Sequence, residues 1–490
     1  MQLNELKVVD YLDMVKSKEI SVEEVIKDIF QQIDRIDHTL KAYLYINQEE
    51  ALSDAKKMDR RIKDNDITPL AGLPVAIKDN ICIKGMETTC ASRILKGFIP
   101  PYDATVISRL REAGAIIIGK TNLDEFSMGS TTKNSAFQVT LNPWDITRVP
   151  GGSSGGSAVA VASHEALIAL GTDTGGSVRL PASFCGIVGI KPTYGRISRY
   201  GVISSSSSLD QVGILSKGVK DAAILMNIIS GYDPLDSTSY HISIPDFLLS
   251  CAKDGIKNFK FAVPKEFFKQ ELNIGVKERV SDSLNKILKL GGELEEISLP
   301  NLEYALSAYS IISMAEASSN LAKFDGIQYG LRMGDISNLE DMYLKTRSEG
   351  FGSEVKRRLT LGTYFLSSGY YEDYYLKAQK VRNLIKEDFK KAFQKYDLII
   401  GPTAPTPPFL AEERIDSQLT MLLADVYTIP VNLAGLPALT INCGFTSKER
   451  LPVGLQIIGG PFQEEKMLRV AYNLEQELKE FNTIKPNLSF

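Results

Sequence analysis

Two glycine-rich stretches, Gly-Gly-Ser-Ser-Gly-Gly-Ser at residues 151–157 and Gly-Thr-Asp-Thr-Gly-Gly-Ser at residues 171–177, enclose a short apolar segment. A glycine–serine run by itself is typical of a flexible linker. Here, however, residues 158–162 are small and apolar and predict a buried helix, and residues 166–170 predict a short buried strand. Because ordering so many glycines costs conformational entropy, such loops between packed elements indicate a functional site rather than a tether.

The second stretch has the features of a catalytic turn. Successive glycines allow backbone N–H groups to converge on one point, where they can hold a phosphate or a developing oxyanion. Ser177 ends this turn and is a candidate nucleophile. The usual base for serine is histidine, but His38, His164 and His241 all lie outside the glycine-rich stretches. Lys78, which ends an apolar segment predicted to be a buried strand, is the alternative, because burial disfavours the ammonium form.

Lys78 and both glycine-rich stretches, including the 24-residue step from Ser153 to Ser177, resemble the amidase signature family. The resemblance implies the Ser–cis-Ser–Lys triad of that family. Ser177 would be the nucleophile, Ser153 a bridging serine on a cis peptide bond, and Lys78 the base. The oxyanion hole would be formed by the backbone N–H groups of Thr174, Gly175, Gly176 and Ser177.

Residues 316–330 and 350–371 are not general to that family and resemble the A subunits of glutamine-dependent tRNA amidotransferases. This resemblance implies that Tyr309, Arg358 and Asp425 hold the amino-acid end of glutamine. An arginine fork suits the α-carboxylate, and a carboxylate suits the ammonium group. Arg357 is the alternative to Arg358. Without the family, an adjacent arginine pair on a helix would indicate surface salt bridges.

The same resemblance implies a function and partners. The chain would be the glutaminase subunit that supplies ammonia for converting Glu-tRNA(Gln), Asp-tRNA(Asn) or both to the amidated forms. Its partners would be subunits B and C in a heterotrimer. ATP and Mg²⁺ would bind the partner subunit, through which the misacylated tRNA would mainly be bound, so no cofactor or metal is expected in this chain. A stand-alone amidase acting on small amides, and a scaffold with an inactive site, are the alternatives.

A P-loop pattern at residues 114–121, Gly-Ala-Ile-Ile-Ile-Gly-Lys-Thr, argues for a nucleotide site in this chain, but its context argues against one. A phosphate-binding loop needs small, flexible residues between its glycines. The segment between these glycines is β-branched and apolar and predicts a buried strand, at residues 115–118. We therefore expect a structural element here and no nucleotide.

Composition places the chain among ordinary globular proteins, with 43% hydrophobic and 24% charged residues. The net charge of −4 gives no global attraction to nucleic acid. Five scattered cysteines without Cys-x-x-Cys spacing indicate neither a disulfide framework nor a zinc site, and Cys185 is expected to be a buried apolar residue. The chain begins without a signal-peptide pattern and has no apolar run near the roughly 18 residues of a membrane span, which favours a cytoplasmic protein.

Short apolar strands that alternate with helices after residue 65 predict an α/β fold, with a mixed, mainly parallel central sheet covered by helices on both faces. Residues 1–65 are expected to form an N-terminal helical segment, with a capping box at Ser21, and residues 66–480 the amidase signature domain. Within that domain, residues 232–300 resemble the family least and contain a predicted helix at 276–290. Further predictions are a helix at 103–113 capped by Asp103, a loop at 204–208, and strands at 75–81, 398–405, 425–437 and 451–459.

Overall fold

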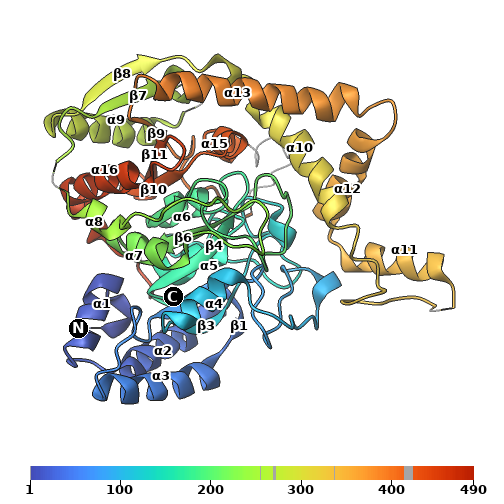
Figure 1. The fold of residues 1–490 in the computed structure, drawn as a ribbon, viewed down its shortest axis with the longest axis horizontal. Helices are drawn as coiled ribbons and strands as arrows, with labels where there is room; N and C mark the ends of the chain where they lie inside the picture. Colours follow the sequence, from blue (N-terminus) through green and yellow to red (C-terminus); the bar gives the residue numbers. More distant parts are fainter. Residues whose placement is uncertain (1, 254, 269–271, 336, 413–422, 490) are drawn as a thin grey trace.

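The computed structural model describes residues 2–253, 255–268, 272–335, 337–412 and 423–489, and in these residues one eleven-stranded sheet forms the centre of the molecule (Figure 1). In the order in which they lie side by side, the strands are β1 (Tyr43–Ile46), β3 (Ile116–Thr121), β2 (Pro74–Lys78), β4 (Ile168–Asp173), β6 (Gln211–Ser216), β5 (Val188–Lys191), β10 (Ala438–Phe445), β11 (Pro452–Gly459), β9 (Leu398–Pro402), β7 (Lys260–Pro264) and β8 (Glu293–Ile297).

The sheet is mixed, as predicted, but parallel pairs do not predominate. Among the described residues, β2 pairs in parallel with β3 and β4, and β7 pairs in parallel with β8 and β9. The remaining six strand pairs are antiparallel. The short connection between β10 and β11 permits only an antiparallel pair, because a parallel pair needs a crossover of a dozen or more residues. The α/β prediction is thus confirmed, and the expected excess of parallel pairs is corrected.

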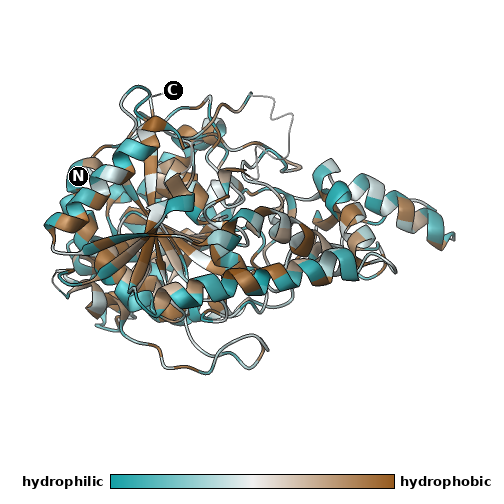
Figure 2. Cartoon of the chain, turned by 90° about the horizontal axis from the view of Figure 1, so that it is seen from above, coloured by the Kyte–Doolittle hydropathy of each residue, from teal (hydrophilic) through white to brown (hydrophobic). Residues whose placement is uncertain are grey.

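Helices cover the sheet on both sides (Figure 2). All residues of β2, β3, β4 and β6 are buried, which is why these strands are almost continuously apolar rather than alternating. The helices are α1 (Val8–Lys16), α2 (Val22–Leu40), α3 (Gln48–Lys63), α4 (Thr105–Glu112), α5 (Gly155–Ala162), α6 (Arg179–Cys185), α7 (Val219–Ile229), α8 (Phe247–Cys251), α9 (Ile274–Lys289), α10 (Ala305–Asn320), α11 (Leu339–Gly350), α12 (Ser353–Leu366), α13 (Lys377–Phe393), α15 (Ile429–Ala434), α16 (Glu464–Glu477) and α17 (Lys479–Asn482). None of the described helices is both long enough and apolar enough to cross a membrane.

The first 65 residues are mainly helical, and the predicted capping box is present. Ser21 accepts the Glu24 N–H, and the Glu24 side chain accepts the Ser21 N–H, at the start of α2. The segment also contains β1, which was not predicted and which pairs antiparallel with β3 at one edge of the sheet. Its sequence, Tyr-Leu-Tyr-Ile, has high β-propensity, but four residues between two long helices give almost no periodicity to detect.

Asp103 does not cap α4, contrary to prediction. The helix begins at Thr105 after Ala104, which makes no side-chain cap. The Asp103 carboxylate instead accepts the N–H of Lys84 at 2.7 Å and pairs with Arg111 at 2.6 Å. A carboxylate near a helix start can satisfy donors from elsewhere in the fold, and the sequence alone does not show those donors.

The predicted strand at 425–437 is also wrong, because this segment contains the short helix α15. Pro430 lies in the first turn of α15, where proline is favoured because its missing N–H would have no helical partner. The strand that the apolar pattern indicates is β10, which begins at Ala438. The other two strands predicted in this part of the chain are confirmed as β9 and β11.

The P-loop pattern is confirmed to be structural. Residues 116–121 form β3, and every residue of this strand is buried. Lys120, the lysine of the pattern, is fully buried and pairs with Asp79 at 2.8 Å. Its Nζ also donates to the hydroxyl of Thr88 at 2.7 Å. The lysine is thus held by protein groups inside the sheet.

Residues 232–300 complete the sheet rather than forming a separate appendage. They contribute β7 and β8, which extend the sheet beyond β9, and the predicted helix, which forms as α9. After them, α12 and α13 both pack against α10. Figure 1 shows these helices reaching away from the sheet, with α11 farthest from it.

Candidate active site

Lys78 is the last residue of β2, so the strand delivers its side chain to the edge where the two glycine-rich loops meet. Its Nζ lies 2.7 Å from Ser153 Oγ and 2.9 Å from Ser154 Oγ. It also lies 3.3 Å from the carbonyl oxygen of Thr172. The side chain is fully buried, and this burial lowers the pKa of Lys78 to about 7. A neutral amine is therefore accessible near neutral pH, within hydrogen-bond distance of two hydroxyl groups.

The loop that carries Ser153 is joined to the turn that carries Ser177. The peptide bond between Gly152 and Ser153 is cis, as the family resemblance implies. Ser154 donates its N–H to the carbonyl of Ser177 at 3.1 Å, and its hydroxyl donates to Thr172. Among the described contacts, no hydrogen bond links the hydroxyls of Ser153 and Ser177. The structure thus brings Lys78 and Ser153 into contact and places Ser177 on the adjoining turn.

The turn between β4 and α6 has the geometry of an anion-binding loop. Within the described residues, we find no acceptor for the N–H groups of Gly175, Gly176 and Ser177. A Cβ on Gly175 would lie 2.7 Å from the hydroxyl oxygen of Tyr309, and one on Gly176, at φ +142°, would lie 2.2 Å from Thr428 Oγ1. Both glycines are therefore needed for close approach, and the second also for its backbone conformation.

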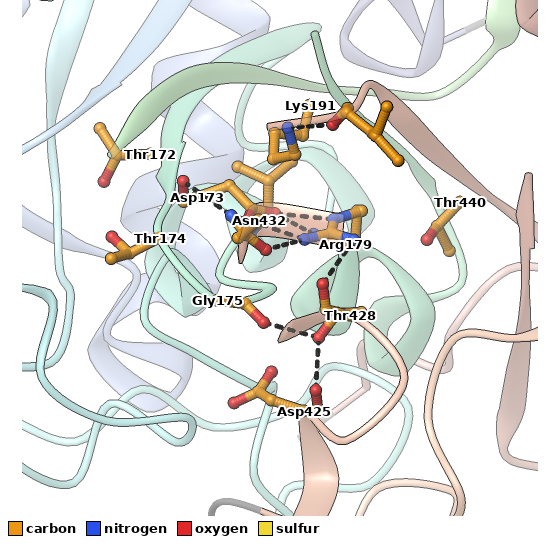
Figure 3. Close-up of polar contacts among 12 residues, drawn as sticks. Thr172, Asp173, Thr174, Gly175, Arg179, Lys191, Asp425, Thr428, Asn432 and Thr440 are labelled. Atoms are coloured by element: carbon orange, nitrogen blue, oxygen red, sulfur yellow. Dashed lines mark hydrogen bonds and ion pairs between the residues drawn. The ribbon is translucent and has the colours of Figure 1, made fainter. Parts of the chain in front are cut away.

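This turn is flanked by a buried ion pair that the sequence analysis did not identify. Arg179, the first residue of α6, and Asp173, the last of β4, are both fully buried and lie 3.0 Å apart (Figure 3). Burial raises the pKa of Asp173, but the Arg179 guanidinium outweighs it and brings the pKa to about 2. Arg179 also binds Asn432 and Gln456. An arginine within an apolar helix could have signalled such a pair, because buried charges need partners.

The turn is also held from its two sides. Thr428 Oγ1 donates to the carbonyl of Gly175 at 2.7 Å (Figure 3). Thr174 Oγ1 donates to Asp210 at 2.6 Å. Asp210 in turn accepts the N–H groups of Ser205 and Ser206. The serine run at 204–208 is a loop, as predicted. Its backbone N–H groups bind the Asp210 carboxylate, which in turn accepts the hydroxyl of Thr174.

Tyr309 and Asp425 both lie against this turn, since a Cβ on Gly176 would lie 2.6 Å from Asp425 Oδ1. Tyr309 lies on α10 and is packed against Gly175. Asp425 Oδ2 accepts the Ser130 hydroxyl at 2.5 Å, whereas its Oδ1 is buried without a partner among the described residues. Burial raises the pKa of Asp425 to about 7. A buried carboxylate oxygen without a donor is suited to a cationic ligand.

Both candidate arginines lie on α12 and bind Glu354. Arg357 contacts this carboxylate through two nitrogens, at 2.8 and 2.9 Å, and Arg358 through Nε at 2.7 Å. Both arginines therefore form the helix salt bridges that an adjacent arginine pair indicates without the family. Arg358 is the less exposed side chain, at 12% against 29%. Burial raises the pKa of Tyr309, and the positive charge of Arg358 partly opposes this rise.

Cys185 is buried and takes no part in this arrangement, as predicted. It ends α6, and burial raises the pKa of its thiol well above the usual range. A thiol that stays protonated is a poor nucleophile. In the part of the chain that the structure describes, no group of three or more His, Cys, Asp and Glu side chains could hold a metal ion.

Comparisons with known proteins show the family of this chain. The family model described as Amidase matches residues 24–468. The chain is 53% identical over its full length, and over the full length of the relative, to a protein from Thermodesulfovibrio yellowstonii that is named as the A subunit of glutamyl-tRNA(Gln) amidotransferase. It is 54% identical to the protein of the same name from Thermoanaerobacter pseudethanolicus, over 98% of each chain.

Solved structures extend the likeness to three dimensions. The crystal structure of the A subunit of glutamyl-tRNA(Gln) amidotransferase from Thermotoga maritima matches with a TM-score of 0.83 and 40% identity, over 100% of this chain and 99% of that one. A bacterial aryl acylamidase, at 22% identity and a TM-score of 0.86, shares the fold. With its lysine and paired serines, and with a family match that covers most of its length, this chain belongs to the amidase family.

Proposed function

We propose that the chain is the glutaminase subunit of a tRNA-dependent amidotransferase. It hydrolyses glutamine and supplies the ammonia that converts Glu-tRNA(Gln), Asp-tRNA(Asn) or both to the amidated forms. The observation that carries this proposal is the 2.7 Å contact between Lys78 and Ser153, fully buried beside a turn whose N–H groups have no acceptor among the described residues. Full-length relatives of more than 50% identity that are named as this subunit support the choice of reaction.

The first half of the reaction is acyl transfer to Ser177. Neutral Lys78 accepts the hydroxyl proton of Ser153, and Ser153 accepts the proton of Ser177 as Ser177 Oγ attacks the side-chain amide carbon of glutamine. The negative charge on the amide oxygen is stabilised by the N–H groups of the turn at Gly175 and Gly176. The proton returns through Ser153 to the amide nitrogen, the C–N bond breaks, and ammonia leaves a γ-glutamyl ester on Ser177.

The second half repeats these proton transfers with water. Water gives a proton to the Ser153–Lys78 pair and attacks the ester carbon, and the same N–H groups stabilise the second oxyanion. The proton then passes to Ser177 Oγ as the ester bond breaks and glutamate leaves. The structure supports this relay because Ser154 fixes both sides of it, binding Lys78 Nζ through its hydroxyl and the carbonyl of Ser177 through its N–H.

The groups around the turn suit the amino-acid end of glutamine. Asp425, with one buried oxygen that has no partner among the described residues, accepts the α-ammonium group. Arg358, which shares its carboxylate partner with Arg357, exchanges part of that contact for the α-carboxylate of glutamine. Tyr309 is packed on Gly175 and so borders the same site. Selectivity for glutamine over neutral amides follows from these two opposite charges.

The rest of the assembly follows from the family rather than from contacts within this chain. The partners are subunits B and C, which together with this chain form a heterotrimer in the cytoplasm. ATP and Mg²⁺ are bound by a partner subunit, which also makes most of the contact with the misacylated tRNA. The burial of Lys120 in β3 is consistent with this division, because the P-loop pattern of this chain offers no phosphate site.

The test is a transamidation assay on the chain co-expressed with its partner subunits. With misacylated tRNA and ATP, the wild-type complex should use either glutamine or ammonium salts. Ser177→Ala should lose the glutamine-dependent reaction and keep the ammonium-dependent one. A stand-alone amidase predicts instead that the wild-type chain hydrolyses neutral amides as well as glutamine and never supports transamidation.

A further inference from the structure

We propose that Glu125 is a positioning residue for glutamine binding: its carboxylate fixes the N-terminus of α12 and so sets the place of Arg358 against Tyr309. This inference rests on the proposed function. Glu125 lies in the loop after β3, was not a candidate from the sequence, and is 1% exposed. One of its partners, Gly352, directly precedes α12 and lies 227 residues later in the chain.

The Glu125 carboxylate binds the residue that precedes α12. Its Oε1 and Oε2 lie 3.2 and 2.9 Å from the N–H of Gly352, and Oε1 also accepts the Ser92 hydroxyl at 2.5 Å. The first N–H groups of a helix lack helical acceptors, and a negative charge there is stabilised by the helix dipole. A Cβ on Gly352 would lie 2.3 Å from Glu125 Oε2, so this glycine is needed for the close approach of the carboxylate.

A second close contact holds α12 farther along its length. A Cβ on Gly362 would lie 2.0 Å from the carbonyl oxygen of Met314, so α12 crosses α10 with the two backbones almost touching. Gly352 and Gly362 are ten residues apart, or about 15 Å along a helix. Arg358 lies between these two fixed points. Because α10 also carries Tyr309, fixing both points of α12 fixes Arg358 relative to Tyr309.

The neighbours of Glu125 connect this anchor to the rest of the site. The ring of Phe126 packs edge-on against Phe351, the residue before Gly352, with ring centres 5.8 Å apart. On the other side, Asp124 accepts the N–H groups of Thr131 at 3.1 Å and Thr132 at 2.9 Å. These residues directly follow Ser130, which binds Asp425. Adjacent acidic residues thus hold the arginine side and the aspartate side of the proposed glutamine site.

The test compares two variants that disturb this anchor in different ways. Glu125→Gln keeps the size of the side chain and removes its charge, whereas Gly352→Ala leaves the charge and pushes the helix away. Glu349→Gln is the matched control, because Glu349 is an exposed carboxylate that lines the same cavity of about 300 Å³ as Glu125. Each variant is measured in the complex with its partner subunits, for kcat and KM with glutamine and for the rate at which p-nitrophenyl acetate acylates Ser177.

We expect both anchor variants to raise the KM for glutamine about tenfold, while acylation by the ester, which has no α-charges, stays near wild type. The control should match wild type in both assays. An unchanged KM in both anchor variants would overturn the proposal, as would equal losses with glutamine and ester. Should Glu125→Gln not fold, Gly352→Ala alone decides by the same criteria. A wild-type complex that acylates with the ester but does not hydrolyse glutamine would instead refute the proposed function.

Discussion

Lys78 and Ser153, which are 75 residues apart in the chain, are joined by a 2.7 Å hydrogen bond from which solvent is excluded. The lysine comes from the end of a strand and the serine from the loop before a helix, so the sheet and the glycine-rich loop must both be in place to form this pair. Burial beside hydroxyl and carbonyl groups, with no carboxylate in direct contact among the described residues, suits the amine to the proposed role of base rather than to that of a salt-bridge partner.

Replacing Lys78 by arginine should be nearly as damaging as replacing it by alanine. A guanidinium stays protonated at any working pH, so it cannot accept the Ser153 proton even though it keeps the positive charge. We expect both Lys78→Arg and Lys78→Ala to lower kcat for glutamine hydrolysis by at least about 100-fold. Steady-state kinetics of the two variants decide the point. Substantial activity in Lys78→Arg would mean that the lysine acts only as a fixed charge.

Glutamine hydrolysis should increase as the pH rises through about 7, because Lys78 is a base only without its proton and its pKa is lowered to about 7. Asp425, whose pKa is raised to about 7, acts in the same direction, since only its ionised form attracts an ammonium group. The profile of kcat/KM against pH should therefore have an ascending limb near 7. In Asp425→Asn the limb due to Lys78 should remain. A flat profile for the wild type from pH about 5.5 to about 9 would contradict this account.

The same shift predicts how stability depends on pH. Between the folded-state pKa of about 7 and the usual lysine value of 10.5, the unfolded chain binds a proton at Lys78 and the folded protein does not. Stability linked to this residue should therefore increase with pH across that range. Comparing the pH dependence of unfolding in wild type and Lys78→Met measures it. Identical slopes in the two proteins would show that the lysine is charged in the folded state.

Arg358→Ala and Asp425→Ala should raise the KM for glutamine while sparing transamidation from ammonium salts. Each change removes one charge-assisted contact and leaves the opposite charge of the substrate without a partner, at a cost of about 2–5 kcal/mol, or roughly 30-fold to several thousand-fold. Arg357→Ala, measured in parallel, distinguishes between the two arginines, and the lower exposure of Arg358 predicts the larger effect there. If all three variants bind glutamine like wild type, the assignment of these residues fails.

Lys120→Met should destabilise the protein without altering any nucleotide dependence. The lysine and Asp79 form a fully buried ion pair, and removing one partner leaves an uncompensated charge, at a cost of about 3–5 kcal/mol. A thermal unfolding scan should show a clearly lower midpoint. The double variant Lys120→Met with Asp79→Asn should recover part of the loss. An unchanged midpoint, together with weaker nucleotide binding by this chain, would restore the P-loop interpretation.

Local sequence patterns predicted those elements that are determined by the residues within them. The capping box at Ser21, the buried helix and strand between the two glycine-rich stretches, and the strand over the P-loop pattern all form as expected, because propensity and burial favour the same structure at each place. The proposed triad could be named because the glycine-rich motifs and their spacing are specific. What failed was the prediction that Asp103 caps α4, because its carboxylate binds the N–H of Lys84 and the side chain of Arg111, near the end of that helix, instead of the first N–H groups of α4.

The supporting residues of the site could not be predicted for the same reason. Arg179 and Asp173 lie only six residues apart, but Arg179 also binds Asn432 and Gln456, which lie more than 250 residues later in the chain. The pairing of Ser130 with Asp425 spans 295 residues. In the sequence, Glu125 looks like an ordinary loop glutamate, because only the folded chain brings Gly352 next to it. Such contacts form only in the folded chain, and neither the hydrophobic periodicity nor a local sequence motif predicts them.

The most direct test of the central claim is to trap the covalent intermediate on Ser177. The complex is mixed with glutamine, quenched in acid within one turnover, digested, and examined by mass spectrometry, with Ser177→Ala as the control. We predict a γ-glutamyl ester on the peptide that contains Ser177 in the wild type and no adduct in the variant. Glutamine consumed with no adduct on Ser177, or an adduct on another residue that persists in Ser177→Ala, would contradict the account.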